Sequence, residues 1–416
     1  MMKLLGKWLV CSLLLMAGVG FAQQIKTLKV PAEALQVAKS TNVFALEFYK
    51  EMPNEDNFSF SPYSISSAFA MVYNGSKGST QKEISTIFHY PTSVEEMNKG
   101  WEWLNKYFTF YPSNASEDVR LSVANSLWIQ SNFPILPIFR DTMGKYFKGA
   151  FRFVDFKAQT ETSRATINAW VKQNTFGKIV DILSSEAIDS STRMVLISAL
   201  YMKAKWKNSF DSRLTHQQPF FTQDGNVQTV LSMTQTAYFP YGDTPEVALL
   251  EMPYIPSRPD GPQLSMLIVL PHQKEGLSDL EKNLSAEKFQ EWVRLLQNTR
   301  MLVTLPKFKA LSSFELNDAF KRVGMGLPFT DQADFSGMTG VKGLKIGHVL
   351  HKIYVSMDET GSEAAAATAI GMNVTSVADP KPPVLFEVDH PFIYIIFEKT
   401  TGMILFMGKV MDPNKV

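Results

Sequence analysis

Residues that could serve as nucleophiles or general bases are present, but they form no catalytic pattern. The chain has one cysteine, Cys11, and six histidines. A serine hydrolase needs a serine activated by a histidine, which an acid orients in turn. Neither G-x-S-x-G nor H-E-x-x-H occurs, and no histidine stands in a catalytic frame. We therefore expect that the chain is not an enzyme and needs no metal and no cofactor.

The segment from Glu359 to Pro383 is the most unusual part of the sequence. It consists mainly of small residues with few charges, and three prolines close it. Its alanines favour a helix by propensity. Its length and closing prolines favour a long exposed loop, which in a compact protein usually has a function.

The overall composition is that of an ordinary globular protein. The 416 residues include 45% hydrophobic and 19% charged residues, with a formal net charge of +1. A charge this close to zero argues against a broad surface for nucleic acid or for a membrane.

The first residues predict a secretory signal peptide over residues 1–22. Lys3 and Lys7 precede a short apolar stretch, and Gly20-Phe21-Ala22 supplies small residues before Gln23. The stretch is short for a bilayer-spanning helix, although an uncleaved anchor is the alternative. The mature chain would then have no cysteine, so it could form no disulfide. We expect it to be secreted or extracellular, with the periplasm or the cell surface as alternatives.

The remaining chain predicts one mixed α+β unit, residues 23–416, without repeats or a dividing linker. Apolar periodicity indicates helices over 30–50, 163–173 and 277–296 and strands over 57–60, 121–130, 194–203 and 302–305. Ser61-Pro62 is typical of a helix start. The apolar runs at 392–397 and 403–407 flank Thr400-Thr401-Gly402 and predict a β-hairpin.

Several short motifs follow one another in a characteristic order. They are Asn57-Phe58-Ser59-Phe60-Ser61-Pro62, Ile167-Asn168-Ala169-Trp170-Val171, Thr175-Phe176-Gly177-Lys178-Ile179, Tyr201-Met202-Lys203-Ala204-Lys205-Trp206, Leu305-Pro306-Lys307-Phe308, Ala333-Asp334-Phe335-Ser336-Gly337-Met338 and Asp389-His390-Pro391-Phe392. With these motifs, nearly all of the mature chain resembles the serpin family. Each motif is weak alone, but the ordered set is specific.

The resemblance implies a serpin fold, with helices packed on large β-sheets and an exposed reactive-centre loop at about residues 359–385. It also implies inhibition by a suicide mechanism. A serine protease, or a cysteine protease, cleaves the loop and forms an acyl-enzyme. The freed loop then enters the main sheet as a new strand and distorts the covalently trapped protease. The implied partner is therefore a protease, and the native protein is expected to be a monomer.

The residue pattern of the loop suits insertion as a strand. The resemblance assigns the hinge to Glu359, Gly361, Ser362, Glu363, Ala364, Ala365, Ala366 and Ala367. Alternate residues of a strand face opposite sides. One face would carry Ser362, Ala364, Ala366, Thr368, Ile370 and Met372, and it begins with small residues. Glu363 falls on the other face, and Gly361 supplies conformational freedom.

Counting from the hinge with the family's spacing places the scissile bond at Thr375-Ser376. Met372, Asn373 and Val374 are the alternative reactive-centre residues. No arginine or lysine lies beside the bond, which suggests elastase-like, chymotrypsin-like or subtilisin-like targets rather than trypsin-like ones.

The resemblance also implies two control points. Lys307 and Glu359 would form an ion pair where the loop enters the sheet, with Trp206 packed nearby. Ser61, Ser64, Ser198 and His351 would form a polar cluster under the centre of the sheet. Serpins usually have asparagine where this chain has Ser198, and a hydroxyl cannot reproduce the hydrogen bonds of an amide.

Two other functions follow from the same resemblance. A non-inhibitory serpin that acts as a carrier, chaperone or storage protein is the main alternative, although such members often carry bulky or charged hinge residues. Binding of heparin-like polyanions is less favoured, because residues 93–118 offer only Lys99 and Lys106. Asn57, Asn114, Asn283 and Asn373 head glycosylation-type triplets, which matter only in a glycosylating host.

Overall fold

Two large β-sheets form the framework of the molecule, and helices pack around them. The computed structural model describes residues 29–53, 56–108, 119–148, 150–258, 260–362 and 381–415. The six-stranded sheet has the order β10-β11-β12-β4-β2-β3. The second sheet has nine strands, in the order β1-β15-β14-β8-β7-β6-β9-β13, with β5 paired to β6. Helices and sheets occur together in one unit, so the α+β prediction is confirmed.

The strands of the six-stranded sheet come from distant parts of the chain. They are β2 (Val119–Gln130), β3 (Phe151–Val154), β4 (Met194–Lys205), β10 (Phe308–Glu315), β11 (His348–Met357) and β12 (Gly361–Ser362). The nine-stranded sheet contains β1 (Phe58–Phe60), β5 (His216–Phe221), β6 (Val227–Asp243), β7 (Val247–Pro253), β8 (Leu264–Pro271), β9 (Gln297–Pro306), β13 (Val384–Glu387), β14 (Phe392–Glu398) and β15 (Ile404–Val410).

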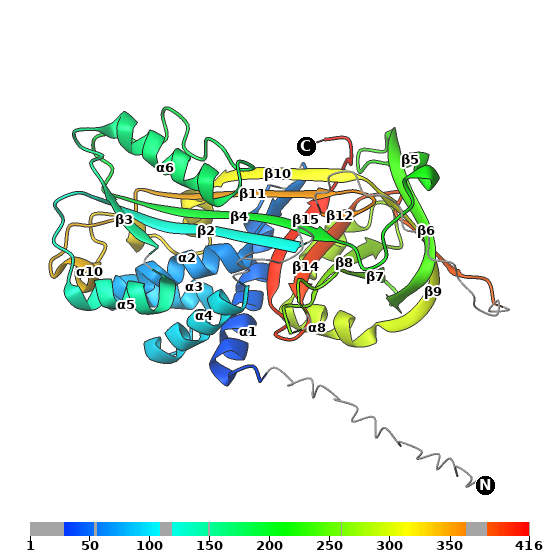
Figure 1. Ribbon diagram of the computed structural model, residues 1–416, viewed down its shortest axis with the longest axis horizontal. Coiled ribbons are helices and arrows are strands. Elements are labelled where there is room, and N and C mark those ends of the chain that lie inside the picture. Colours follow the sequence, from blue (N-terminus) through cyan, green and yellow to red (C-terminus); the bar gives the residue numbers. More distant parts are fainter. Residues whose placement is uncertain are drawn as a thin grey trace, which may run out of the picture.

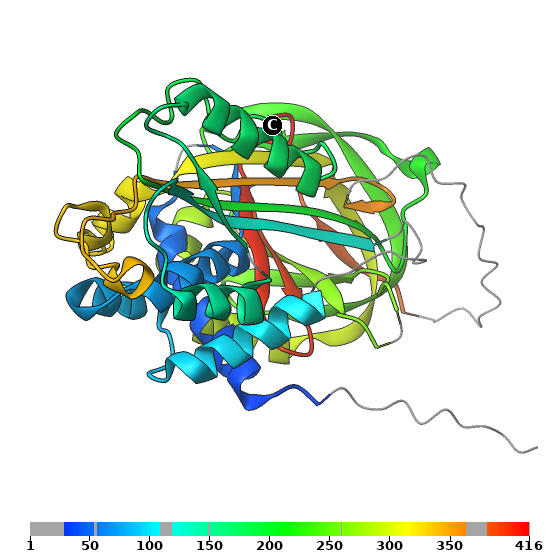
Figure 2. The same ribbon diagram turned by 60° about the vertical axis from the view of Figure 1, so that its left-hand side comes forward.

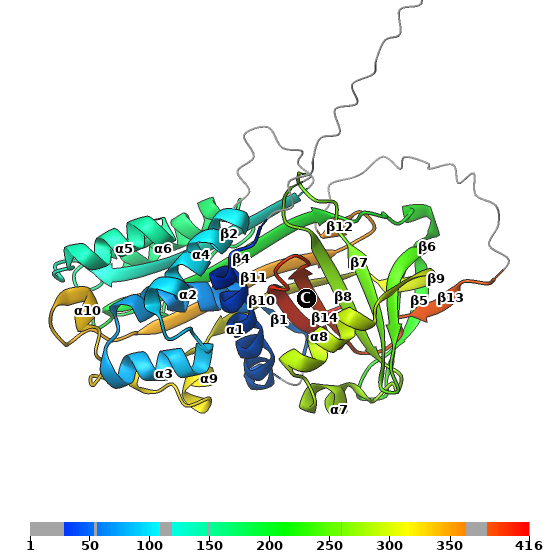
Figure 3. The ribbon, with the colours of Figure 1, turned by 90° about the horizontal axis from the view of Figure 1, so that it is seen from below.

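Helices cover both faces of the six-stranded sheet, as Figure 1 shows. The helices are α1 (Ala32–Phe48), α2 (Pro62–Gly75), α3 (Gly78–Phe88), α4 (Val94–Phe108), α5 (Pro137–Phe147), α6 (Thr160–Asn174), α7 (Leu277–Lys282), α8 (Ala286–Leu295), α9 (Asn317–Arg322) and α10 (Ser336–Thr339). Short 3₁₀ turns span Tyr49–Glu51, Ser212–Leu214 and Leu327–Phe329. Figure 1 places α6 on one side of this sheet and α2 to α5 on the other, and the view from below shows α1 to α4 near one another (Figure 3).

The outer face of this sheet is covered by α6 over only part of its length (Figure 2). Ile167 and Val171 of α6 are buried in a small apolar cluster with Val195 and Ile197 of β4. The main core lies on the other face, where α2 packs against both sheets and α1 packs against α2, α4 and β15.

Local sequence signals explain most of these elements. Pro62 stands in the first turn of α2, and the Ser61 hydroxyl accepts a hydrogen bond from the Ser64 N–H. The C-terminal hairpin pairs β14 with β15, as predicted. One expectation was wrong: residues 277–296 form two helices rather than one. The chain leaves the helical path at Asn283, and Ser285 caps a new helix by accepting from the Lys288 N–H.

Candidate functional site

The chain that leads into the loop already lies inside the six-stranded sheet. Its last described residues, Gly361 and Ser362, form β12 between β11 and β4 (Figure 1). Ser362 is antiparallel to Met357 on one side and to Ala204 on the other. Gly361 has a φ of +150°, and a Cβ there would clash with the backbone of Ala204 and Lys205. This position therefore requires glycine, as the hinge assignment implies.

Beyond the end of β12, the strands β4 and β11 are hydrogen-bonded directly to each other. They are parallel, and the pairing runs from His348 opposite Val195 to Tyr354 opposite Tyr201. The sheet is thus open at one end and closed along the rest of these strands. Any further strand between them would have to break this pairing.

The expected ion pair is present where the loop enters the sheet. Lys307 Nζ lies 2.8 Å and 3.0 Å from the two carboxylate oxygens of Glu359. The Thr215 hydroxyl donates to the same carboxylate at 2.7 Å. Burial raises the pKa of Glu359, but the hydrogen bonds from Lys307 and Thr215 outweigh it, so its pKa is lowered. The carboxylate therefore stays ionised and holds its partners.

Trp206 holds the backbone of the same turn. Its backbone N–H donates to the Thr360 carbonyl at 2.8 Å, and its indole Nε1–H donates to the Asp358 carbonyl at 3.0 Å. The ring stacks on Tyr254 with centroids 4.4 Å apart. The Tyr254 hydroxyl lies 2.9 Å from the Ser362 hydroxyl. Trp206 thus anchors Asp358 and Thr360, and its stacking partner Tyr254 contacts Ser362.

The four residues of the expected polar cluster meet beneath the sheet, and all are fully buried. Ser61 and Ser64 come from the start of α2, Ser198 from β4 and His351 from β11. The Ser61 N–H donates to His351 Nε2 at 3.0 Å. His351 Nδ1 therefore carries the proton, and it lies 3.0 Å from the Ser198 carbonyl and 2.9 Å from the Ser198 hydroxyl.

Ser198 is fully integrated into this cluster despite its short side chain. Its hydroxyl donates to the Ser64 hydroxyl at 2.8 Å, which donates to Asn125 Oδ1 at 2.6 Å. The Asn125 amide returns a hydrogen bond to the Ser64 carbonyl at 2.9 Å. Ser198 and Asn125 are register partners on β4 and β2, so an amide is still present one strand away. Sequence reasoning missed Asn125, because only the pairing of β2 with β4 brings it to the cluster.

Burial lowers the pKa of His351 to about 3, although the hydrogen bond with Ser198 acts in the opposite direction. The imidazole is therefore neutral at neutral pH. It can connect β11 to both α2 and β4 without a buried charge.

The remaining predicted loop residues lie outside the described part of the chain. They are Glu363, Ala364, Ala365, Ala366, Ala367, Met372, Asn373, Val374, Thr375 and Ser376. The same holds for the predicted signal peptide, residues 1–22.

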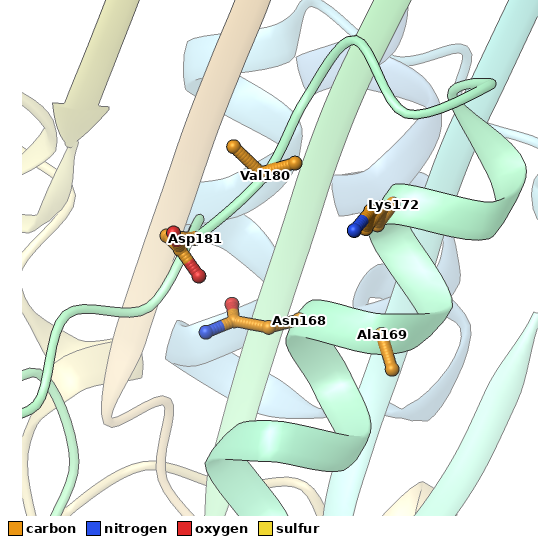
Figure 4. A pocket seen from close by; sticks show the side chains of 5 residues that line it. All are labelled: Asn168, Ala169, Lys172, Val180 and Asp181. Atoms are coloured by element: carbon orange, nitrogen blue, oxygen red, sulfur yellow. The ribbon is translucent and has the colours of Figure 1, made fainter.

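A hollow of about 340 Å³ lies between α6 and the chain that follows it. Its lining comprises Asn168, Ala169, Lys172, Val180 and Asp181 (Figure 4). The Asn168 side chain bonds both the N–H and the carbonyl of Leu183 at 2.9 Å. Asn168 thus holds the segment after α6 in place. Among the described residues, no group of three or more His, Cys, Asp or Glu side chains could hold a metal ion. No described helix is long and apolar enough to cross a membrane.

Comparison with known proteins agrees with this architecture. Residues 39–413 match the family model described as serpin (serine protease inhibitor). A leukocyte elastase inhibitor A of Rattus norvegicus is 36% identical over 390 residues, which cover 91% of this chain and 100% of the rat protein. An uncharacterized serpin-like protein of Thermococcus kodakarensis is 35% identical over 380 residues, covering 91% and 86%.

A solved structure shows the same fold. Arabidopsis AtSerpin1, described in its native stressed conformation, is 26% identical, with a TM-score of 0.80 over 92% of this chain and 99% of that chain. The architecture of this chain is therefore a serpin fold. The chain belongs to the serpin family.

Proposed function

We propose that this chain is a secreted inhibitor of serine proteases that acts as a suicide substrate. The observation that carries the proposal is the position of β12. Gly361 and Ser362 both pair with β4, and Ser362 also pairs with β11, at the one end of the sheet where β4 and β11 are not paired directly with each other. After cleavage, the loop could extend β12 into the sheet, because its first residues are already paired there.

The strand register supports continued insertion. If residues follow Ser362 one for one, Ala365 faces Tyr354 on β11 and Tyr201 on β4. These two tyrosines are direct partners in the present pairing. A single register thus satisfies both edges of the opening without a bulge. In this register Thr368 would lie between His351 and Ser198, and its hydroxyl would enter the polar cluster.

The pairing energy favours insertion. One parallel pairing would be exchanged for two antiparallel ones, which are slightly more stable per residue. A new strand of about 15 residues, at ~0.5–1.5 kcal/mol net per hydrogen bond, contributes on the order of 10 kcal/mol. That energy is comparable with the stability of a whole domain, which is enough to distort a captured protease.

The loop sequence favours targets that cleave after small or apolar residues. Thr375-Ser376 is the proposed scissile bond, and neither neighbour is basic. Relatives named leukocyte elastase inhibitor support an elastase-like target. Chymotrypsin-like and subtilisin-like proteases remain within the same proposal.

The experiment is to mix the mature protein separately with elastase, chymotrypsin, subtilisin and trypsin. Denaturing gels and intact mass should show a stable covalent complex with at least one of the first three. A released peptide that begins at Ser376 would establish the scissile bond, whereas another new N-terminus would move the bond but keep the mechanism. Cleavage by every protease without any complex would refute inhibition and favour a non-inhibitory carrier, chaperone or storage role.

Export is the second part of the proposal. Residues 1–22 have the charge and apolar pattern of a signal peptide, which would leave residues 23–416 as the mature domain. N-terminal sequencing of protein recovered outside the producing cells should begin at Gln23. Full-length protein that stays with the cells would contradict secretion.

A further inference from the structure

The motif Asp389-His390-Pro391-Phe392 forms the junction between β13 and β14, and the proposed mechanism gives it no role. β13 is the first described strand after the loop. It lies at the edge of the nine-stranded sheet, where its only partner in the described part of the chain is β9 (Figure 3). The contacts of this junction therefore hold the strand into which the far end of the loop leads.

The packing of β13 itself is weak. Val384 and Leu385 are 40% and 70% exposed, and Phe386 alone among the four strand residues is buried. Before the strand, Arg300 of β9 donates a hydrogen bond to the Lys381 carbonyl at 3.1 Å. A short edge strand with so little buried surface belongs to the less stable parts of a fold. Its position therefore depends on the contacts at its two ends.

The histidine of the junction is buried between two hydrogen-bond acceptors. His390 is 5% exposed. Its Nε2 lies 2.7 Å from the Pro271 carbonyl oxygen at the end of β8, and its Nδ1 lies 2.6 Å from the Asp389 carboxylate. A carbonyl and an ionised carboxylate have no proton to donate, so the ring makes both hydrogen bonds only when both nitrogens are protonated. The arrangement therefore favours the imidazolium cation.

Asp389 stays ionised because two cations flank it. Burial raises the pKa of its carboxyl group, but hydrogen bonds from His390 and Lys274 outweigh burial, so the pKa is lowered. Lys274 Nζ lies 3.1 Å from the second carboxylate oxygen and 3.0 Å from the centre of the Phe221 ring. Among the described residues, Asp389 is the charged group in contact with His390, and Lys274 lies behind it. Glu387, at the end of β13, is exposed.

The junction also connects β13 to three other strands. The Phe221 N–H of β5 donates to the Asp389 carbonyl at 2.7 Å, and the Val388 N–H donates to a carbonyl of β9 at 2.9 Å. The contact between His390 and Pro271 adds β8. No described side chain of β5, β8 or β9 forms an ion pair with the imidazole. The charge of His390 is therefore balanced from its own turn, by Asp389.

We propose that His390 is a proton-operated latch on β13. With both nitrogens protonated, the imidazolium links the end of β8 to the turn after β13. After the loss of one proton, a nitrogen lone pair faces either the Asp389 carboxylate or the Pro271 carbonyl, and that contact becomes repulsive. Hydrogen bonds from a cation are stronger than those from a neutral group. The junction therefore loosens as the pH rises.

Release of β13 would have a consequence for the loop, and this consequence rests on the proposed function. The loop connects Ser362, which is seated in β12, with the start of β13. Detaching residues 384–387 from β9 would add about 13 Å of free chain at ~3.3 Å per residue. A longer free chain could extend β12 into the sheet without cleavage. The protein would then lose its inhibitory form faster at alkaline pH.

Hydrogen–deuterium exchange tests the latch on the intact protein without a protease. Protection factors, which correct for the intrinsic pH dependence of exchange, are compared at about pH 6 and about pH 8.5. For residues 384–388 of the parent, protection should fall about tenfold or more between these values, as expected for the loss of one charge-assisted hydrogen bond. Protection of β14 should stay unchanged. Equal protection of residues 384–388 at both values, or a parallel loss in β14, would overturn a local latch.

Two variants separate the charge of the side chain from its size. His390→Gln cannot become a cation, so its protection should be low at both pH values. His390→Lys keeps a cation, so its protection should stay high at about pH 8.5. The control His89→Gln removes an exposed histidine that is paired with Glu47, and it should keep the parent's pH dependence.

If His390→Gln keeps the pH dependence of the parent, another group titrates and the proposal fails. Loss of the pH dependence in His89→Gln would also refute it. The parent and this control decide the question even if both substitutions at His390 prevent folding. Because exchange does not depend on inhibition, a parent that traps proteases but shows no change in protection would refute the latch alone.

Discussion

At the residue scale, the polar cluster shows how a small side chain can serve where the family usually has an amide. The Ser198 hydroxyl contacts both Ser64 and His351, and Asn125 ends the chain of hydrogen bonds. The polar side chains of this cluster therefore all have hydrogen-bond partners, which avoids the cost of an unsatisfied donor or acceptor. The departure at Ser198 changes the route of the hydrogen bonds and leaves the cluster intact.

Replacing Ser198 with alanine should destabilise the native state by about 1–2 kcal/mol, because the Ser64 hydroxyl loses its buried donor. The His351 proton keeps the Ser198 carbonyl, so the imidazole stays in place. Urea unfolding measures the change. Ser313→Ala, at an exposed position of β10, is the control and should change stability by less than about 0.5 kcal/mol. An equal effect of both substitutions would contradict the role of Ser198.

His351 should make the native state sensitive to acid. Its pKa is about 3 when folded and about 6.5 when unfolded. Below pH 6.5 the unfolded chain binds a proton that the native state does not, so stability falls as the pH falls, until the folded pKa is reached. Between pH 6.5 and 4.5 the loss from this group is about 2 kcal/mol. Urea unfolding of His351→Gln should show a correspondingly smaller pH dependence, and an unchanged dependence would contradict this assignment.

At the scale of elements, the decisive feature is the junction of β4, β11 and β12. The two long strands are paired directly over most of their length, while β12 separates them at one end. Lys307, Glu359 and Trp206 hold the turn that leads into β12. We expect these contacts to control how readily the sheet opens if the loop inserts.

Replacing Lys307 with methionine should loosen this junction. The Glu359 carboxylate is 13% exposed and Lys307 is 34% exposed, so the pair is partly screened by solvent. We expect a loss of about 1 kcal/mol in native stability, measured by thermal unfolding. We also expect a synthetic peptide of residues 362–375 to anneal faster to the native protein, measured by native gels. Lys282→Met, which breaks an exposed pair with Asp279, should change neither. Slower or unchanged annealing in Lys307→Met would contradict the control role.

At the scale of the whole molecule, the native form would be less stable than the loop-inserted form, because its six-stranded sheet can still accept a strand. The six-stranded sheet would gain a longer strand if the loop inserted, and that strand would be antiparallel to both β4 and β11. Inhibition and sensitivity to the junction both depend on this one rearrangement.

Cleavage in the loop should therefore raise the melting temperature by about 12 °C, as expected from about 10 kcal/mol of new pairing in a domain of this size. Differential scanning calorimetry before and after limited proteolysis measures the shift. Thr368→Val should reduce the gain by a few degrees without affecting the uncleaved protein, because the hydroxyl reaches the cluster only after insertion. Thr368→Ser should keep the full gain. A cleaved form with an unchanged melting temperature would exclude insertion.

The sequence by itself determined the family, the α+β class and most element positions, because helix caps, apolar periodicity and turn residues are local signals. Ser61-Pro62 marked the start of α2, and the runs around Thr400-Thr401-Gly402 marked the final hairpin. It also pointed to both partners of the Lys307–Glu359 pair, through the motifs that the family shares.

Only the tertiary structure decided which distant residues meet. Asn125 joins the cluster because β2 pairs with β4 in one register, and a shift by one residue would turn it to the other face. Arg120 lies opposite Lys203 for the same reason, although the chain separates them widely. Strand order and register depend on packing of the whole chain, so no local pattern could have revealed either arrangement.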